Sequence, residues 1–164
     1  MTDIELEALA RRVGQTLAAR GWRLATAESC TGGWIAEAVT AIGGSSAWFD
    51  RGFVTYSNEA KMDMLGVSAR TLGGHGAVSE ATAVEMAAGA LARSLAEVAV
   101  AVSGIAGPSG GTPTKPVGMV CLAWAARDSV SRVLTAHFDG DREAVRRQAV
   151  IHALEGVIAI AAAA

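Results

Sequence analysis

A serine in a glycine-containing turn has the type and the position that nucleophilic chemistry requires. Ser29 lies in the turn 28–33, directly before a predicted helix. Backbone N–H groups at a helix start point outward, and the positive end of the helix dipole favours a developing oxyanion. Gly32 and Gly33 let a ligand approach the backbone of this turn closely. The pattern fits a structural role equally well, in which Ser29 or Thr31 only caps the helix.

The next predicted strand ends in a tyrosine and is followed by a lysine. Tyr56 ends that strand, and Lys61 lies about one helical turn further on. A hydroxyl nucleophile needs a base, and burial lowers the pKa of a lysine so that it can act as one. The alternative is a solvated Lys61 beside a half-buried Tyr56. Because Ser29 and Lys61 follow neighbouring strands, and no histidine lies in a recognised nucleophile motif, the catalytic interpretation is favoured.

The densest glycine cluster of the chain follows a third predicted strand. Ser103 ends this strand, and the loop 104–111 comes next. Successive N–H groups in such a loop form a concavity that suits anions. The spacing matches neither a dinucleotide fingerprint nor a Walker A loop, and an ordinary connector is the alternative. Its glycines are Gly104, Gly107, Gly110 and Gly111.

Two arginines lie four residues apart in the last predicted helix. Arg142 and Arg146 therefore share one helix face. Guanidinium groups match the oxygens of a phosphate, so this pair can clamp one. A solvated basic face that includes Asp141 and Glu143 fits the pattern equally well.

The elements that position these residues alternate between helix and strand. Strand 98–103 is an unbroken run of small apolar residues, which is typical of a strand buried on both faces. The short connection 127–129 makes the last two strands antiparallel neighbours. The pattern predicts an α/β fold: a three-layer α/β/α sandwich around a mixed, mainly parallel sheet with a C-terminal antiparallel hairpin. We expect helices over 4–19, 31–42 and 58–65, after Ser79 and after 139–141; strands over 23–27, 52–56, 98–103, 117–126 and 130–138; and a loop over 73–76.

Composition and charge exclude several classes of protein. The 164 residues fit one domain, and a net charge of −2 without any Lys/Arg run argues against a nucleic-acid partner. The two cysteines lie outside any CxxC pattern, so we expect neither a zinc site nor a disulfide framework. We also expect no cofactor. We find no signal segment and no apolar stretch long enough to span a membrane. The expectation is a cytoplasmic protein that forms one domain over residues 1–164.

Six stretches of the sequence resemble the CinA C-terminal domain family. Their order and spacing are preserved over nearly the whole chain, which is more specific than any single motif. Met119 departs from the pattern, because the family often has threonine there. We expect the separate activity of the molybdopterin-binding-like domain of longer family members to be missing. The stretches are AESCTGG at 27–33, GSSAWFDRGFVTYSNEAK at 44–61, HGAVSE at 75–80, SGIAGPSGG at 103–111, KPVG at 115–118 and GDREAVRRQ at 140–148.

The resemblance implies a reaction and a role for each candidate residue. The reaction is deamidation of nicotinamide mononucleotide to nicotinic acid mononucleotide and ammonia, in pyridine nucleotide recycling. Ser29 is then the nucleophile and Lys61 its base, with Tyr56 beside them or relaying the proton. N–H groups at 31–33 hold the oxyanion, Ser103 and the glycine loop line the site, and Arg142 or Arg146 engages the phosphate.

The resemblance also implies metal-independent chemistry and a homo-oligomer, with a dimer expected. Two alternatives stay open at this point. One is a non-catalytic interaction module of the competence-associated CinA type, and the other is a hydrolase that acts on a different small amide.

Overall fold

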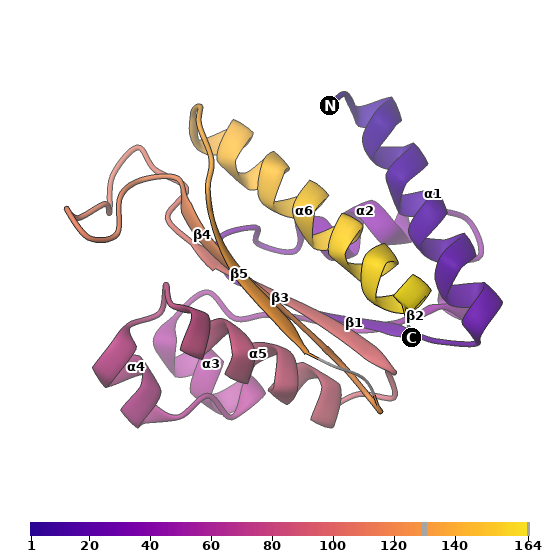
Figure 1. The fold of residues 1–164 in the computed structure, drawn as a ribbon, viewed down its shortest axis with the longest axis horizontal. Coiled ribbons are helices and arrows are strands. Elements are labelled where there is room, and N and C mark those ends of the chain that lie inside the picture. Colours follow the sequence, from indigo (N-terminus) through magenta and orange to yellow (C-terminus); the bar gives the residue numbers. More distant parts are fainter. Residues whose placement is uncertain (129–130, 164) are drawn as a thin grey trace.

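The computed structural model describes residues 1–128 and 131–163 of the chain (Figure 1). Helices and strands alternate along most of the sequence before two consecutive strands and a long final helix. In chain order they are α1 (Asp3–Arg20), β1 (Leu24–Glu28), α2 (Trp34–Thr40), the short 3-10 helix η1 (Ser45–Ala47), β2 (Phe49–Val54), α3 (Asn58–Leu65), α4 (Ala69–His75), α5 (Glu80–Ala92), β3 (Val98–Gly104), β4 (Met119–Ala126), β5 (Arg132–His137) and α6 (Arg142–Ala163).

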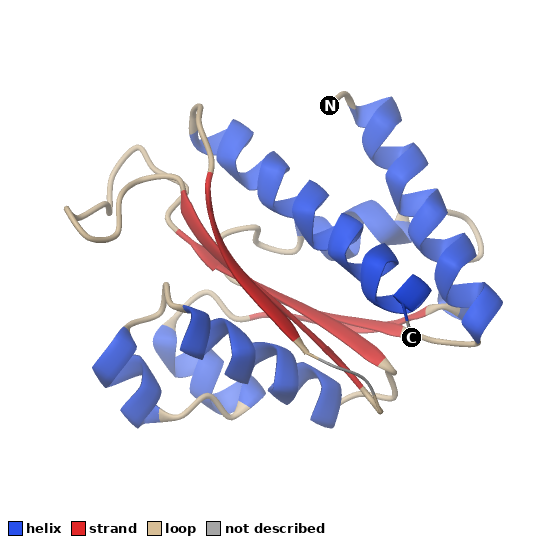
Figure 2. Ribbon diagram, in the orientation of Figure 1, coloured by secondary structure: helices blue, strands red, loops and turns tan. Residues whose placement is uncertain are grey.

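The five strands form one mixed sheet between two layers of helices. The strand order is β2-β1-β3-β4-β5, with β1 parallel to both β2 and β3. Strand β4 is antiparallel to both β3 and β5, so four of the five strands share one direction. Helices α1, α2 and α6 cover one face, and α3, α4 and α5 cover the other (Figures 1 and 2). The predicted α/β/α sandwich with a C-terminal antiparallel hairpin is confirmed.

Strand β3 lies at the centre of the sheet and divides the core. Val98, Val100 and Val102 belong to the apolar cluster on the side of α1 and α6. The alternate residues, Ala99 and Ala101, belong to the cluster under α5. All five are fully buried, as the small-apolar run predicts for a strand covered on both faces. The strand therefore holds its carboxyl end in a fixed place, and this end carries Ser103.

Two predicted boundaries are wrong for reasons of local chemistry. Residues 73–75, expected in a loop, form the last turn of α4, which begins at the cap Ser68; its hydroxyl accepts the N–H groups of Arg70 and Thr71. Helix α2 begins at Trp34 rather than at residue 31, because Gly32 and Gly33 have positive φ angles of 60° and 103°.

The other predicted elements agree with the structure to within a few residues. The range 58–65 matches α3, and the Ser79 hydroxyl caps α5 by accepting the N–H of Thr82. Strand β2 ends at Val54, two residues earlier than expected, which leaves Tyr56 in the connection to α3. The predicted start of the last strand at residue 130 lies outside the described residues.

Candidate active site

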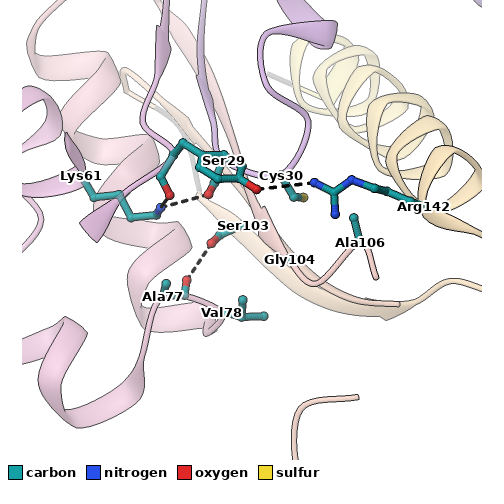
Figure 3. A pocket seen from close by; sticks show the side chains of 10 residues that line it. Ser29, Cys30, Lys61, Ala77, Val78, Ser103, Gly104, Ala106 and Arg142 are labelled. Carbon is teal, nitrogen blue, oxygen red and sulfur yellow. Dashed lines mark hydrogen bonds between the residues drawn. The ribbon is translucent and has the colours of Figure 1, made fainter. Parts of the chain in front are cut away.

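A cavity of about 260 Å³ opens at the carboxyl ends of the parallel strands. Its apolar wall comes from Ala77, Val78 and Ala106. The polar residues that line it come from positions far apart in the sequence. Those that follow β1, β2 and β3 meet because these strands lie side by side, and Arg142 comes from the start of α6 (Figure 3). The polar lining residues are Ser29, Cys30, Tyr56, Lys61, Ser103 and Arg142.

Ser29 and Lys61 are in direct contact inside this cavity. The distance from the Lys61 Nζ to the Ser29 Oγ is 3.0 Å. Both side chains are buried, with 1 % of Lys61 and 8 % of Ser29 exposed. Ser29 is fixed because its N–H donates to the carbonyl of Val102 at 3.0 Å, which extends the parallel pairing of β1 and β3. The structure thus brings together the serine and the lysine that the sequence analysis singled out.

The other two hydrogen-bond partners of Lys61 are backbone carbonyls, so only the hydrogen bond with Ser29 can change its donor. The Nζ donates to the carbonyl of Thr55 at 2.8 Å and to that of Tyr56 at 3.2 Å. Carbonyl oxygens only accept, whereas a serine hydroxyl both donates and accepts. A neutral amine has two N–H groups and one lone pair. It can therefore keep both carbonyl bonds while its lone pair accepts the O–H of Ser29.

Burial favours this neutral form of the amine. Desolvation lowers the pKa of Lys61 below its ordinary value, and the neighbouring Cys30 opposes that shift only in part. No carboxylate is bonded to Lys61 in the described structure. Burial also raises the pKa of the Cys30 thiol to about 11, so Cys30 is a neutral thiol at physiological pH. The arrangement thus places a serine hydroxyl beside an amine whose pKa is lowered.

The turn 29–33 is held in place by two charged side chains. The Glu28 carboxylate accepts the N–H groups of Ile35 and Ala36 at 2.9 and 3.1 Å, which occupies the start of α2. Arg146 donates its Nε to the carbonyl of Cys30 at 3.0 Å and an Nη to that of Thr31 at 3.2 Å. These contacts hold the turn in place, and the N–H groups that Glu28 accepts are not those of residues 31–33, which were expected to serve an oxyanion.

The residues 31–33 lie behind the cavity rather than in its wall. The N–H of Gly32 donates to the carbonyl of Ser29 at 3.1 Å, which closes the turn on itself. Neither Thr31 nor Gly33 lines the cavity, whereas Cys30 does. The N–H of Cys30 donates to no backbone carbonyl among the described residues, and Cys30 directly follows Ser29 in the chain. Because Cys30 lines the cavity, its N–H is a further candidate donor for an oxyanion beside the predicted ones.

Tyr56 contributes its backbone to Lys61 and its side chain to the mouth of the cavity. Tyr56 is 65 % exposed, and its hydroxyl accepts from an Nη of Arg142 at 3.5 Å. The contact with Lys61 is made by the Tyr56 carbonyl. A proton relay through the phenol is therefore not the arrangement found.

The first residues of the glycine loop lie at the cavity, whereas its later residues pack within the loop itself. Gly104 lines the cavity, and the carbonyl of Gly107 accepts from Arg142 at 2.8 Å. Gly110 and Gly111 are exposed and lie outside the cavity wall. At Gly111 a Cβ would lie 2.8 Å from the backbone nitrogen of Val117, so close packing of the loop explains this glycine.

The two arginines of α6 have different surroundings. Arg142 lines the cavity, whereas Arg146 binds the back of the Ser29 turn and lies over the Trp34 ring at 5.4 Å. Of the two phosphate candidates, only Arg142 borders the cavity.

Three lining residues had no role in the sequence analysis. Cys30, Ala77 and Val78 supply no strong chemical signal, although they lie inside motifs that mark the turn 27–33 and the segment 75–80. Within residues 1–128 and 131–163, no group of three His, Cys, Asp or Glu side chains is placed to hold a metal ion. No helix in this part of the chain is long and apolar enough to cross a membrane.

Comparison with known proteins gives consistent matches over nearly the whole chain. The family model described as CinA C-terminal domain matches residues 6–160. A relative from Escherichia coli (strain K12), named nicotinamide-nucleotide amidohydrolase PncC, is 58 % identical over 155 residues, which are 94 % of each chain. A Pseudomonas putida relative of the same name is 55 % identical over 152 residues, covering 92 % of this chain and 93 % of its own. The crystal structure of the competence/damage inducible protein CihA from Agrobacterium tumefaciens superposes with a TM-score of 0.93 at 52 % identity, covering 98 % of this chain and 96 % of that one.

Proposed function

Because the chain belongs to the CinA C-terminal domain family, we propose that it is an amidohydrolase that converts nicotinamide mononucleotide and water to nicotinic acid mononucleotide and ammonia. Two relatives at 58 % and 55 % identity carry the name of this activity. The observation that carries the proposal is the 3.0 Å contact between the Ser29 Oγ and the buried Lys61 Nζ, in a cavity that Arg142 borders. The reaction would place the enzyme in pyridine nucleotide recycling.

The first half of the reaction forms an acyl-enzyme. Neutral Lys61 takes the proton of Ser29 as the Oγ bonds to the carboxamide carbon. The carbonyl oxygen becomes an oxyanion, to which the N–H of Cys30 donates. Lys61 then gives its proton to the amide nitrogen as the C–N bond breaks, and ammonia leaves. The products of this half are an ester on Ser29, neutral Lys61 and ammonia.

The second half hydrolyses that ester with the same base. A water molecule loses a proton to Lys61 and attacks the ester carbon, and the oxyanion forms again at the same place. As the intermediate collapses, Lys61 returns the proton to the Ser29 Oγ. Nicotinic acid mononucleotide is released, and both residues are back in their starting state.

The mouth of the cavity suits the phosphate end of the substrate. Arg142 is held by the Gly107 carbonyl and by the Tyr56 hydroxyl, which fixes the direction of its guanidinium group. A guanidinium group of fixed direction binds phosphate oxygens through two parallel hydrogen bonds. The nucleotide would then lie with its carboxamide at Ser29 and its phosphate at Arg142.

An ammonia-release assay tests the proposal against the two alternatives. Nicotinamide mononucleotide is compared with nicotinamide riboside and nicotinamide, and Ser29→Ala serves as the inactive control. We expect turnover of the mononucleotide to exceed that of the riboside by about tenfold or more, because a charge-assisted hydrogen bond is worth about 1.5–3 kcal/mol. Equal turnover of mononucleotide and riboside would contradict the phosphate site, and no turnover of any of the three would contradict the proposed function in favour of a hydrolase for another amide or a non-catalytic module.

A further inference from the structure

Ser103 places a second buried hydroxyl in the cavity, beside the nucleophile. Parallel pairing matches Glu28 on β1 with Val102 on β3, and Ser29 and Ser103 each come directly after this pair. The Ser103 side chain is 1 % exposed and lines the cavity (Figure 3). The two hydroxyls therefore stand at neighbouring strand ends of one site.

The hydrogen bond that Ser103 makes determines what it offers to a ligand. Its Oγ lies 2.7 Å from the carbonyl oxygen of Ala77. A carbonyl only accepts, so the single proton of the Ser103 hydroxyl is committed to Ala77. No described group donates to the Oγ in return. Ser103 thus presents lone pairs to the cavity and no proton.

The other charged and hydroxyl side chains at the reacting end differ from Ser103 in this respect. Lys61 donates to two carbonyls, and its remaining contact is with Ser29, which has to attack the substrate. Arg142 is a donor only. The Tyr56 hydroxyl lies at the mouth, in contact with Arg142. Ser103 is therefore the buried hydroxyl acceptor next to the nucleophile.

We infer that Ser103 binds the –NH₂ group of the substrate carboxamide and makes the site select an amide over the corresponding acid. This inference rests on the proposed function and adds the group that recognises the bond to be cleaved. A carboxamide nitrogen carries two N–H donors, and one of them matches the free lone pairs of the Ser103 Oγ. The carboxylate of the product has no donor, so the same lone pairs repel it.

This placement has two consequences for the reaction. The N–H···Oγ bond orients the carboxamide so that its carbon faces Ser29 and its oxygen faces the Cys30 N–H. After hydrolysis the bond cannot form, which weakens the hold on the acid and favours its release. One hydroxyl thereby distinguishes substrate from product, which otherwise differ only in –NH₂ against –O⁻.

The test compares an amide with an ester that lacks the N–H group. The kcat/KM of wild type and Ser103→Ala is measured with nicotinamide mononucleotide and with the methyl ester of nicotinic acid mononucleotide. We expect Ser103→Ala to lower the value for the amide about 10-fold to 100-fold, because a buried donor is left without an acceptor. The value for the ester should change by less than about threefold, since the ester never uses the acceptor.

A matched control separates recognition from support of the loop. Thr82 donates its hydroxyl to the carbonyl of Gly76 at 2.7 Å, in the same segment as Ala77 but outside the cavity wall. Thr82→Val removes one hydroxyl-to-carbonyl bond from this segment and keeps the shape of the side chain. It should leave the ratio of amide to ester turnover unchanged.

A binding measurement decides the point without turnover. In a Ser29→Ala background, the Kd values of nicotinamide mononucleotide and nicotinic acid mononucleotide are measured with Ser103 intact and again after Ser103→Ala is added. The protein that keeps Ser103 should bind the amide more tightly than the acid, and Ser103→Ala should remove that preference. If Ser103→Ala lowered kcat/KM equally for the amide and the ester, or if it left the binding preference for the amide unchanged, the role of Ser103 would be overturned. If wild type released no ammonia while the binding preference persisted, the proposed reaction would fall and the recognition by Ser103 would stand.

Discussion

At the scale of single residues, the proposed chemistry depends on a buried lysine whose pKa is lowered by desolvation. Lys61 is buried, bonds to two backbone carbonyls and has no carboxylate partner in the described structure. An ion pair with a carboxylate would stabilise the protonated amine more strongly than two carbonyls and a hydroxyl do. The same environment leaves its lone pair for Ser29. Cys30, although it lies in the same cavity, stays a thiol because burial raises its pKa to about 11.

The pH profile of kcat/KM should report the lowered pKa of Lys61. Only the neutral amine accepts a proton, so the rate should rise with pH as Lys61 loses its proton. Because burial lowers the folded-state pKa, the midpoint should lie below the ~10.4 of a free lysine. Steady-state rates at saturating and low substrate over a pH series measure it. A rate that falls across this range, or a midpoint at the value of free lysine, would argue against Lys61 as the base.

At the scale of elements, the sequence predicts where the chain turns better than what the turns contact. The cap Ser79, the helix over 58–65 and the buried strand over 98–103 follow from short-range patterns, and the structure has them. The role of Glu28 could not be predicted, because its carboxylate reaches over the turn to N–H groups seven and eight residues away. Ser29 could be predicted from the sequence as a candidate site residue, whereas the contacts that hold its turn in place could not.

Long-range contacts also separate side chains that the sequence groups together. Arg142 and Arg146 share a helix face, yet one lines the cavity and the other binds the carbonyls of Cys30 and Thr31. The sequence predicts Tyr56 as the last residue of a strand, but β2 ends at Val54 and the Tyr56 hydroxyl contacts Arg142. These side-chain partners depend on which groups meet in the folded chain, so they cannot be predicted from local sequence spacing.

Helix α6 therefore supplies two arginines whose removal should have different effects. Arg142→Ala should raise the KM for nicotinamide mononucleotide about tenfold or more and leave turnover of the riboside unchanged, because it removes a phosphate ligand. Arg146→Ala should lower kcat with both substrates, because the turn that carries Ser29 loses two backbone contacts. Added guanidinium ion at low concentration should restore part of the kcat of Arg146→Ala only. If Arg142→Ala lowered kcat/KM equally for the mononucleotide and the riboside, the assignment of Arg142 to the phosphate would be wrong.

At the scale of the whole molecule, small residues bring the helices close to the sheet and to each other. Alanines on β3 form the floor under α5, and Gly89 of α5 packs against the backbone of α3. A Cβ at this glycine would lie 2.0 Å from the carbonyl oxygen of Leu65, the last residue of α3. Lys61 also lies on α3. The position of Lys61 thus depends on close packing far from the cavity.

Gly89→Ala should destabilise the fold, because backbone atoms cannot yield as the end of a flexible side chain can. We expect a loss of about 1–3 kcal/mol in the free energy of unfolding, the usual cost of overpacking. Denaturant titration measures it, and Gly73→Ala on the exposed last turn of α4, where a Cβ meets nothing within 4 Å, is the matched control. Equal stability of the two variants would show that α3 and α5 can separate without cost.

The central claim is that Lys61 acts as the base for Ser29, and kcat/KM of Lys61→Arg tests it most directly. Arginine keeps the positive charge but does not lose its proton in proteins, so it cannot accept one from Ser29. We predict that Lys61→Arg, on protein whose circular dichroism matches wild type, loses about 10²-fold to 10⁴-fold in ammonia release, the usual contribution of general-base catalysis. If Lys61→Arg kept activity within a few-fold of wild type, the lysine would serve only by its charge, and the Ser29–Lys61 mechanism would be contradicted.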